Sequence, residues 1–541
     1  MAIIAKRLRK ITILLGILVG LLMLRLGYLQ LYEGKSLALA GLHGRVQEIS
    51  AETKRGDFFD RHHEKLTNST VAYELFLFPA EMPDQQTIRE KLTGIIPEQA
   101  VAVILRLALA KQPLRSHIFV SEATSQFLNK ECPIPGLIAV RVPLRYESNQ
   151  PAAHVIGYVD QTNHGITGLE ARYDLLLTSS EERYVAAMLD GEENLIPGLG
   201  YKEVNGGEAK ASEIVLTLDK NLQRKLEALA DQRMKRGALI VMEAKTGEIL
   251  ALVSRPNFSP AQVARSFQEP YSPLVNRAIT AYQPGSVFKL VVAAAALDLG
   301  IVTPETVFYD AGYIDVDKLR FFGWDYKQGP RGKISFQDAL AFSSNPVFIE
   351  VGQKIGATKL LAYADKLGFG HKTSLSLPDE DAGHLPPVDQ VFPGDLANLS
   401  IGQGSCEVTP LQLASLVGTI VNDGVLVEPK LVAERSADSS KQLLQVLTAR
   451  QLREMMAAVT SYGTGQEAAI SGYGAAGKTG SAETGRADSG GKGINHAWFA
   501  GYTPRDNPQY VIVVFVEEGH SGGEVAAPLF GAVAREVMQQ K

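Results

Sequence analysis

Hydrophobic and polar positions divide the chain into three parts, and the first is an apolar N-terminal segment. Basic residues up to Lys10 precede residues 11–24, which carry no charge, and Arg25 interrupts a mostly apolar continuation to residue 32. The uncharged run is short for a spanning helix, but a snorkelling Arg25 extends it to residues 11–31, which can span a membrane. The basic flank predicts that residues 1–32 are a cytoplasmic stub and a single-pass anchor in the cell membrane. The N-terminus would be cytoplasmic and the rest of the chain would lie outside.

This segment has two alternative interpretations. The first is a cleaved signal peptide, but the small-x-small site Ala38-Leu-Ala40 lies beyond the charged residues Glu33 and Lys35. The second is a buried helix of a soluble protein, which would not require the basic residues before it. We therefore favour an uncleaved anchor.

The second part, residues 33–225, mixes short strands and helices. Residues 71–78 are apolar enough for a strand, and Thr167-Gly-Leu-Glu170 fits a capping box at the start of a helix. Near its end an apolar stripe at helical spacing consists of Leu222, Leu226 and Leu229. No pattern here indicates chemistry, so we expect an elongated α+β pedestal that serves as a scaffold.

The third part, residues 226–541, contains longer apolar strands around a helical middle. Two apolar runs flank Lys245-Thr-Gly247, which indicates a hairpin, and a helix begins at Thr409-Pro410 with proline in its first turn. The C-terminal pattern predicts a strand around residues 478–483 and further elements at residues 496–503, 510–516 and 525–538. We expect an α+β fold with an antiparallel sheet flanked by helices and a cleft between them.

Composition narrows the function without identifying it. A length of 541 residues allows about three domains, and 45% apolar residues are ordinary for a globular protein. The net charge of −5, without a long basic run, gives no indication of nucleic-acid binding. Cys132 and Cys406 are far apart, which makes a disulfide between them improbable, and the ten histidines lack ligand spacing. We expect no metal and no cofactor.

The sequence Ser286-Val-Phe-Lys289 carries the strongest chemical signal. It follows the turn residues Pro284-Gly285 and leads into an apolar run that ends at Gly300, as expected for a helix. A serine at the first helical position and a lysine three residues later share one face. The helix N-terminus adds N–H groups for an oxyanion, so the pattern suits a serine nucleophile activated by lysine.

Two further motifs follow in a characteristic order. Ser343-Ser-Asn345 begins 57 residues after Ser286, and Lys478-Thr-Gly480 begins 133 residues after Asn345. Similar short matches at Ser489-Gly-Gly-Lys492 and at the hairpin turn lack this order and context, and we interpret both as chance. The ordered set is typical of penicillin-binding proteins and serine β-lactamases.

The chain resembles class B penicillin-binding proteins over nearly its whole length. The further motifs that carry the resemblance are Arg25-Leu-Gly-Tyr-Leu-Gln30, Arg55-Gly56 with Asp60-Arg61, His154-Val-Ile-Gly157, Gly165-Ile-Thr-Gly-Leu-Glu170, Thr217-Leu-Asp219 with Gln223, Asn276-Arg-Ala278, and Gly402-Gln-Gly404 with Thr409-Pro410. One departure is His62-His-Glu64, where the family usually has a tight Asn-Gly turn; Thr67 also replaces a small apolar residue.

The resemblance implies a D,D-transpeptidase that cross-links peptidoglycan stem peptides and is acylated by β-lactam antibiotics. Ser286 would attack the D-Ala–D-Ala carbonyl, and Lys289 would be the base, since burial and the charge of Lys478 both favour its neutral form. Ser343 would relay the proton to the leaving amine, and Asn345 would orient Lys289 and the substrate.

The same resemblance assigns the substrate-binding residues Thr479, Gly480 and Ser481. Thr479 would hold the terminal carboxylate together with Lys478, and the N–H groups of Ser286 and Ser481 would form the oxyanion hole. The family also implies a polytopic glycosyltransferase partner in the membrane.

Two other functions compete with this interpretation. The same serine could serve a membrane-anchored D,D-carboxypeptidase or β-lactamase, because hydrolysis differs from transfer only in whether water or an amine meets the acyl-enzyme. The protein could also be a non-catalytic scaffold in a cell-wall complex, although the intact motifs argue against it. No glycosyltransferase motif lies between the anchor and Ser286, which disfavours a bifunctional enzyme.

Overall fold

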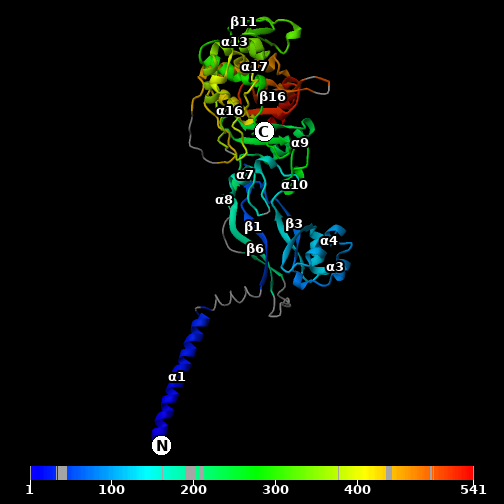
Figure 1. Ribbon diagram of the computed structural model, residues 1–541, viewed down its shortest axis with the longest axis vertical. Coiled ribbons are helices and arrows are strands. Elements are labelled where there is room, and N and C mark those ends of the chain that lie inside the picture. The colour runs from blue at the N-terminus through cyan, green and yellow to red at the C-terminus, as the bar shows by residue number, and fades with distance from the viewer. Residues whose placement is uncertain are drawn as a thin grey trace. The chain divides into compact units, whose positions relative to one another are not determined.

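A computed structural model describes residues 2–31, 33, 46–160, 162–188, 201–205, 212–375, 377–433, 441–487, 490–491 and 493–539. The chain forms two compact units, and both are assembled from segments that are separate in sequence. The first comprises Met1–Lys54, Thr70–Leu144 and Ser179–Lys210, and the second comprises Arg55–Ser69, Arg145–Thr178 and Ala211–Lys541. Figure 1 follows the chain through both units by colour. A single domain boundary near residue 225 stays a prediction.

The N-terminal helix of the first unit is α1 (Ala2–Leu31). Within it, the 20 residues Lys10–Leu29 are long and apolar enough to cross a membrane. Lys10 begins that stretch, and the second charged residue in it, Arg25, lies 5.4 Å from the ring centroid of Tyr28. The long apolar helix expected from the sequence is therefore present.

Two three-stranded sheets and several short helices follow in the first unit. In one of them β3 (Thr70–Leu77) lies between β4 (Leu114–Val120) and β5 (Leu137–Leu144), with both neighbours antiparallel. Apolar residues of this sheet, Leu75 among them, pack with Ile88 and Ile104 of two helices. The remaining elements are β1 (Val46–Arg55), β6 (Thr178–Met188) and β7 (Tyr201–Asn205) of the second sheet, α3 (Gln85–Leu92), α4 (Glu98–Leu107), α5 (Glu122–Gln126) and the turns η1 (Pro79–Glu81) and η2 (Phe127–Glu131). The strand predicted at residues 71–78 is confirmed.

A five-stranded antiparallel sheet organises the second unit. Its strand order is β10 (Ile249–Arg255), β9 (Gly237–Glu243), β17 (Tyr510–Val516), β16 (Gly493–Thr503) and β15 (Ala476–Ala487). Alternate side chains along β9 point to opposite faces, so Leu239 belongs to one hydrophobic cluster and Ile240 to another. Both faces of the sheet are therefore buried.

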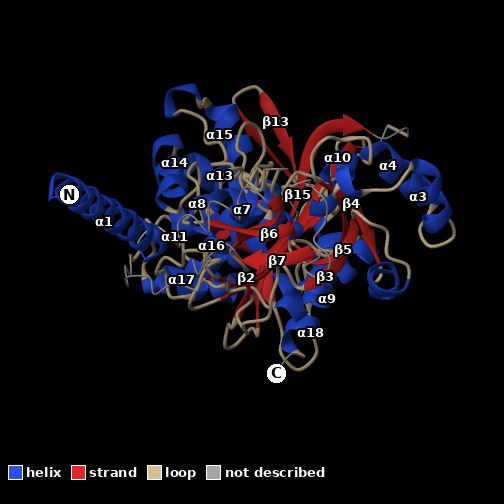
Figure 2. Ribbon diagram, turned by 90° about the horizontal axis from the view of Figure 1, so that it is seen from below, coloured by secondary structure: helices blue, strands red, loops and turns tan. Residues whose placement is uncertain are grey.

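Helices cover the two faces of this sheet. On one face α9 (Lys220–Arg233) and α18 (Ala527–Met538) lie side by side (Figure 2). The other face packs against α11 (Lys289–Asp298), α16 (Pro410–Val421) and α17 (Val446–Ser461). The α+β fold with an antiparallel sheet flanked by helices, as expected from the sequence, is confirmed.

Shorter elements complete the second unit. The helices are α6 (Ala153–Ile156), α7 (Gly168–Arg172), α8 (Asp174–Leu177), α10 (Val263–Ser266), α12 (Phe336–Ala341), α13 (Asn345–Ile355), α14 (Ala357–Lys366) and α15 (Pro393–Ser400). The strands are β2 (Phe58–Phe59) with β8 (Ile214–Val215), β11 (Val307–Asp310) with β14 (Gly332–Ser335), and β12 (Tyr313–Val316) with β13 (Leu319–Phe322). The single turns are η3 (Pro260–Gln262), η4 (Gly285–Phe288), η5 (Tyr326–Gln328), η6 (Val388–Gln390), η7 (Gln466–Ala468) and η8 (Gly522–Ala526).

Several local predictions in this unit are confirmed. Lys245-Thr-Gly247 forms the turn between β9 and β10, and Gly247 there has a φ of +77°. Thr409 caps α16 through the N–H of Gln412 at 3.1 Å, and Pro410 is the first residue of that helix. Residues 62–64 form a turn without glycine, in which His63 itself takes a φ of +60°. The Asp60 side chain accepts a hydrogen bond from the N–H of His62 at 2.8 Å.

The predicted capping box at Thr167 and Glu170 is wrong. The Thr167 side chain makes no capping hydrogen bond, and the Glu170 carboxylate lies in the interior with no exposed side-chain surface. It accepts hydrogen bonds from Arg55 Nε at 2.6 Å, Arg145 Nε at 2.8 Å and the Tyr146 hydroxyl at 3.0 Å. Glu170 is therefore the centre of a buried ionic cluster within the second unit.

Replacing Glu170 with glutamine should destabilise the second unit strongly. The change leaves Arg55 and Arg145 buried without their central counter-charge, which costs about 3 kcal/mol of the free energy of unfolding. Denaturant titration of the detergent-solubilised protein measures it, because both tryptophans, Trp324 and Trp498, belong to the second unit. Glu350→Gln is the control, since its ion pair with Lys354 is half exposed and should contribute little. Equal stabilities of the two variants would contradict the role of Glu170.

Candidate active site

Ser286 lies on a turn of 3-10 helix, η4, and not on the first turn of an α-helix as expected. The α-helix α11 begins at Lys289. Because residues three apart eclipse one another in a 3-10 helix, Ser286 and Lys289 still share one face. Gly285 has a φ of +54°, and a Cβ there would lie 2.5 Å from the carbonyl oxygen of Ser481. A glycine is thus required for the nucleophile turn to approach β15.

Lys289 is fully buried under this turn. Its Nζ donates to the carbonyl oxygen of Ser343 at 2.7 Å and to Asn345 Oδ1 at 2.7 Å, and it lies 3.3 Å from Ser343 Oγ. Burial, and then the nearby charge of Lys478, hold the pKa of Lys289 well below its usual range. The lowered pKa favours the neutral amine, which is the form that can accept a proton.

Ser343 lies in the connection between α12 and α13, and Asn345 is the first residue of α13. Ser343 has a φ of +59°, a left-handed conformation that is uncommon for a residue with a side chain. The next residue, Ser344, caps α13 through the N–H of Val347 and donates to the buried Asp310 Oδ2 at 2.6 Å. These bonds hold the backbone that presents Ser343 and Asn345 to Lys289.

Lys478 reaches the same place from β15. It is fully buried, and its Nζ donates to Ser343 Oγ at 2.9 Å and to the carbonyl oxygen of Thr479 at 2.9 Å. Burial lowers the pKa of Lys478 to about 7. Ser343 Oγ therefore lies within hydrogen-bonding distance of both buried amines, although these come from segments nearly two hundred residues apart.

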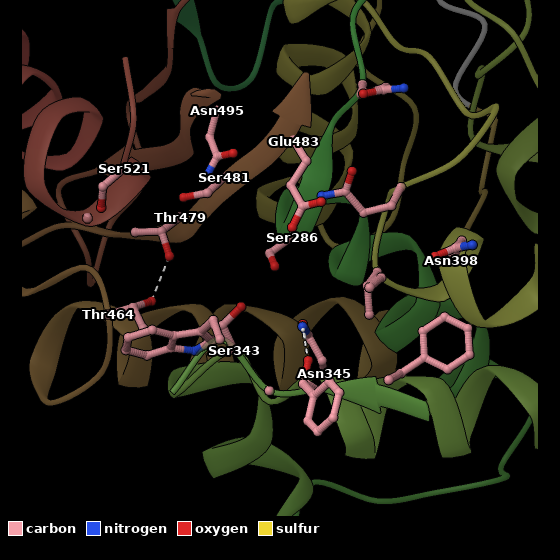
Figure 3. A pocket seen from close by; sticks show the side chains of 18 of the residues that line it. Ser286, Ser343, Asn345, Asn398, Thr464, Thr479, Ser481, Glu483, Asn495 and Ser521 are labelled. Atoms are coloured by element: carbon pink, nitrogen blue, oxygen red, sulfur yellow. Dashed lines mark hydrogen bonds between the residues drawn. The ribbon is translucent and has the colours of Figure 1, made fainter. Parts of the chain in front are cut away.

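A cavity of about 1040 Å³ brings the expected residues together. Its lining includes Ser286, Ser343, Asn345, Thr479 and Ser481, and Figure 3 shows the side chains of Ser286 and Ser343 facing each other across it. Ser286 Oγ makes no hydrogen bond within the described part of the chain, so it is free to meet a ligand.

Gly480, the remaining substrate-binding residue expected from the sequence, is not among the cavity-lining residues but allows two elements to meet. A Cβ on Gly480 would lie 2.9 Å from Val287 Cγ1 and 3.0 Å from the carbonyl oxygen of Pro284. Without that atom β15 packs directly on the nucleophile turn. The N–H groups of Ser286 and Ser481 belong to these two adjoining elements, as an oxyanion site requires.

Two residues at the site had not been expected from the sequence. Thr464 lines the cavity and its hydroxyl lies 2.6 Å from that of Thr479 (Figure 3), and Asp310 anchors Ser344. Thr464 stands in a glycine-flanked loop and Asp310 at a strand end, positions without any motif. Of the chance match, Ser489 and Lys492 lie outside the described residues. Within the described ranges no group of three or more His, Cys, Asp or Glu side chains could hold a metal ion.

Family comparisons agree with this architecture. Residues 237–539 match the penicillin binding protein transpeptidase domain, and residues 50–187 match the penicillin-binding protein dimerisation domain. Stage V sporulation protein D of Bacillus subtilis is 30% identical over 98% of this chain and 85% of that protein. The peptidoglycan D,D-transpeptidase MrdA of Acinetobacter baumannii is 28% identical over 94% of this chain and 84% of its own length.

Solved structures of penicillin-binding proteins are similar to this chain in fold. The penicillin-binding protein PBP2 of Helicobacter pylori matches with a TM-score of 0.74 and 25% identity over 92% of this chain and 99% of its own. Penicillin-binding protein 3 of Mycobacterium tuberculosis in complex with ampicillin matches with a TM-score of 0.63 and 26% identity over 92% of this chain and 96% of its own. The fold and the two matched domains define a penicillin-binding protein with a transpeptidase domain. The chain belongs to the class B penicillin-binding proteins.

Proposed function

We propose that this protein is a serine-type peptidoglycan D,D-transpeptidase that forms an acyl-enzyme on Ser286 and is acylated there by β-lactams. The observation that carries the proposal is the position of Ser343 Oγ, 3.3 Å from Lys289 Nζ and 2.9 Å from Lys478 Nζ, in the cavity that Ser286 lines. The names of two relatives support the reaction type: MrdA of Acinetobacter baumannii, described above, and MrdA of Escherichia coli, which is 26% identical over 80% of this chain, are both named peptidoglycan D,D-transpeptidase.

In the acylation step Lys289 acts as the base. A neutral lysine has two N–H bonds, and the two contacts of 2.7 Å use both, which leaves its lone pair for the proton of Ser286. The Ser286 Oγ–carbon bond forms as the amide C–N bond of D-Ala–D-Ala breaks. The proton passes through Ser343 Oγ to the departing amine, so the enzyme returns to its starting protonation state.

Lys478, Thr479 and the oxyanion site bind the substrate in this proposal. The charged form of Lys478 and the hydroxyl of Thr479 hold the terminal carboxylate, and the N–H groups of Ser286 and Ser481 receive the negative charge that develops on the carbonyl oxygen. Gly480 contributes by letting β15 approach the turn of Ser286. An amine then attacks the ester carbon and takes the acyl group, which completes the transfer.

The membrane arrangement is part of the proposal. α1 anchors the chain in the cell membrane with a cytoplasmic N-terminus, residues 33–225 act as a pedestal, and residues 226–541 catalyse outside. A relative from Helicobacter pylori, PBP2, has been solved in complex with MreC, which supports a role of such proteins in assemblies. We expect a polytopic glycosyltransferase as the partner in the membrane.

A penicillin adduct tests the proposal against its nearest rivals. Incubation of the detergent-solubilised protein with benzylpenicillin should raise the mass of the intact chain by one antibiotic molecule. The adduct should persist for hours, because transfer enzymes exclude water from the acyl-enzyme more effectively than β-lactamases do. Rapid turnover with release of hydrolysed antibiotic would favour a β-lactamase, and no adduct at all would favour a non-catalytic scaffold.

A further inference from the structure

A single carboxylate, that of Glu483, extends the row of site residues along β15. Side chains two apart on a strand share a face, so Thr479, Ser481 and Glu483 all line the cavity. Figure 3 shows Glu483 reaching into the cavity on the side of Ser286. Its position two residues beyond Ser481 corresponds to about 7 Å along the strand.

Among the described residues, none serves as a counter-charge for Glu483. Its side chain is exposed and makes no hydrogen bond or ion pair with any described residue, and the residue opposite on β16 is the neutral Asn495. In the part of the chain that the structure describes, the other charged or titratable residues that line the cavity are Arg320, His520 and Glu524. Arg320 is already held by Asp315 through contacts of 2.7 and 2.8 Å. The open side of the cavity therefore keeps unneutralised negative charge, which favours a cationic ligand group.

The direction of the substrate determines which of its groups reaches Glu483. If Lys478 and Thr479 hold the terminal carboxylate and Ser481 faces the carbonyl under attack, an extended peptide runs along β15 toward Glu483. The residue that precedes the D-Ala–D-Ala pair is then the one beside the Glu483 carboxylate. The leaving amine and the attacking amine both bind at the other end of this path along β15, away from Glu483.

We infer that Glu483 is a specificity residue that binds an ammonium group on the donor, carried by the residue before D-Ala–D-Ala. The inference rests on the proposed function, because it assumes the orientation of an acylating donor. Glu483 takes no part in bond making or breaking. It strengthens the encounter with donors whose charge is positive at this point, and it distinguishes them from neutral donors of the same shape.

Two antibiotics form a matched pair of probes for this site. Ampicillin is benzylpenicillin with one added amino group, on the carbon four bonds from the β-lactam carbonyl carbon. Both react in the same way. The bond from Ser286 Oγ to the β-lactam carbonyl carbon forms, the ring C–N bond breaks, and the ring nitrogen takes the proton. The quantity measured is the ratio of the second-order acylation rate constants, ampicillin to benzylpenicillin, at pH 6, where the amine is protonated.

The full-length protein, Glu483→Gln and the control Glu454→Gln are compared by this ratio. Glu454 is exposed on α17 outside the cavity lining, so its replacement makes the same change in net charge. Glu483→Gln should lower the ratio about five- to tenfold, Glu483→Asp should restore part of it, and Glu454→Gln should leave it unchanged. Added salt should lower the wild-type ratio as well.

Two outcomes would overturn the inference. The ratio could be the same in Glu483→Gln as in the wild type, and a fall of both rate constants by one factor would then indicate a structural role alone. Alternatively, Glu454→Gln could lower the ratio as much as Glu483→Gln does. Failure of either antibiotic to acylate the wild-type protein would instead overturn the proposed function, and this inference with it.

Discussion

Replacing Ser286 with alanine should abolish covalent labelling by a fluorescent penicillin, with a loss of at least about 10⁴-fold in the acylation rate constant. The reason is chemical, since among the described residues no other hydroxyl stands on a glycine-preceded 3-10 turn with a buried lysine three residues later. The fold should remain, because Ser286 Oγ makes no hydrogen bond within the described residues. In-gel fluorescence measures the labelling and thermal unfolding measures the fold.

Ser343→Ala is the matched control for this experiment. It removes a hydroxyl of the same cavity that the proposal makes a proton relay, so labelling should become slower and not disappear. If the Ser286→Ala protein were labelled as well as the wild type while Ser343→Ala lost its label, the nucleophile would be Ser343 and the assignment would be wrong.

Replacing Lys289 should have the second-largest effect, a loss of about 10³-fold in acylation. Lys289→Ala removes the base, but it also leaves the acceptors on Ser343 and Asn345 without their donor. Lys289→Arg separates the two effects, because arginine keeps N–H donors at this position but stays protonated and cannot accept the proton of Ser286. Stopped-flow or time-resolved labelling with benzylpenicillin gives the rate constants.

The two variants should be similarly slow if Lys289 is the base. An arginine variant that acylates within about tenfold of the wild type would mean that position 289 needs only a positive charge. The role of base would then have to be moved to another residue, and Lys478 is the other amine close to Ser343 Oγ.

Local chemistry explains which features the sequence predicted. The three site motifs, which begin at Ser286, Ser343 and Lys478, were predictable because their order is fixed by the fold. The start of α16 was predictable because Thr409, Pro410 and Gln412 all lie within one turn. The alternation of residues along β15 follows from strand geometry and needs no distant partner.

Long-range partners explain what could not be predicted. Glu170 has the spacing of a capping residue, but Arg55 lies 115 positions away in sequence and decides its role. The left-handed conformation of Ser343 depends on neighbours such as Asp310, which anchors the following residue from 34 positions away. Thr464 joins the site only because the chain after α17 passes beside β15.

The pH dependence of acylation tests most directly whether one buried lysine is neutral while the other is charged. A neutral Lys289 is required, and its pKa is well below the ordinary value, so the rising limb ends far below pH 10. Lys478 must stay protonated to hold the carboxylate of the antibiotic, and its pKa is about 7. The second-order rate constant for benzylpenicillin should therefore pass through a maximum and fall as the pH rises above about 7. A rate constant that climbs steadily to pH 10, as for a base with the pKa of an ordinary lysine, would contradict the account.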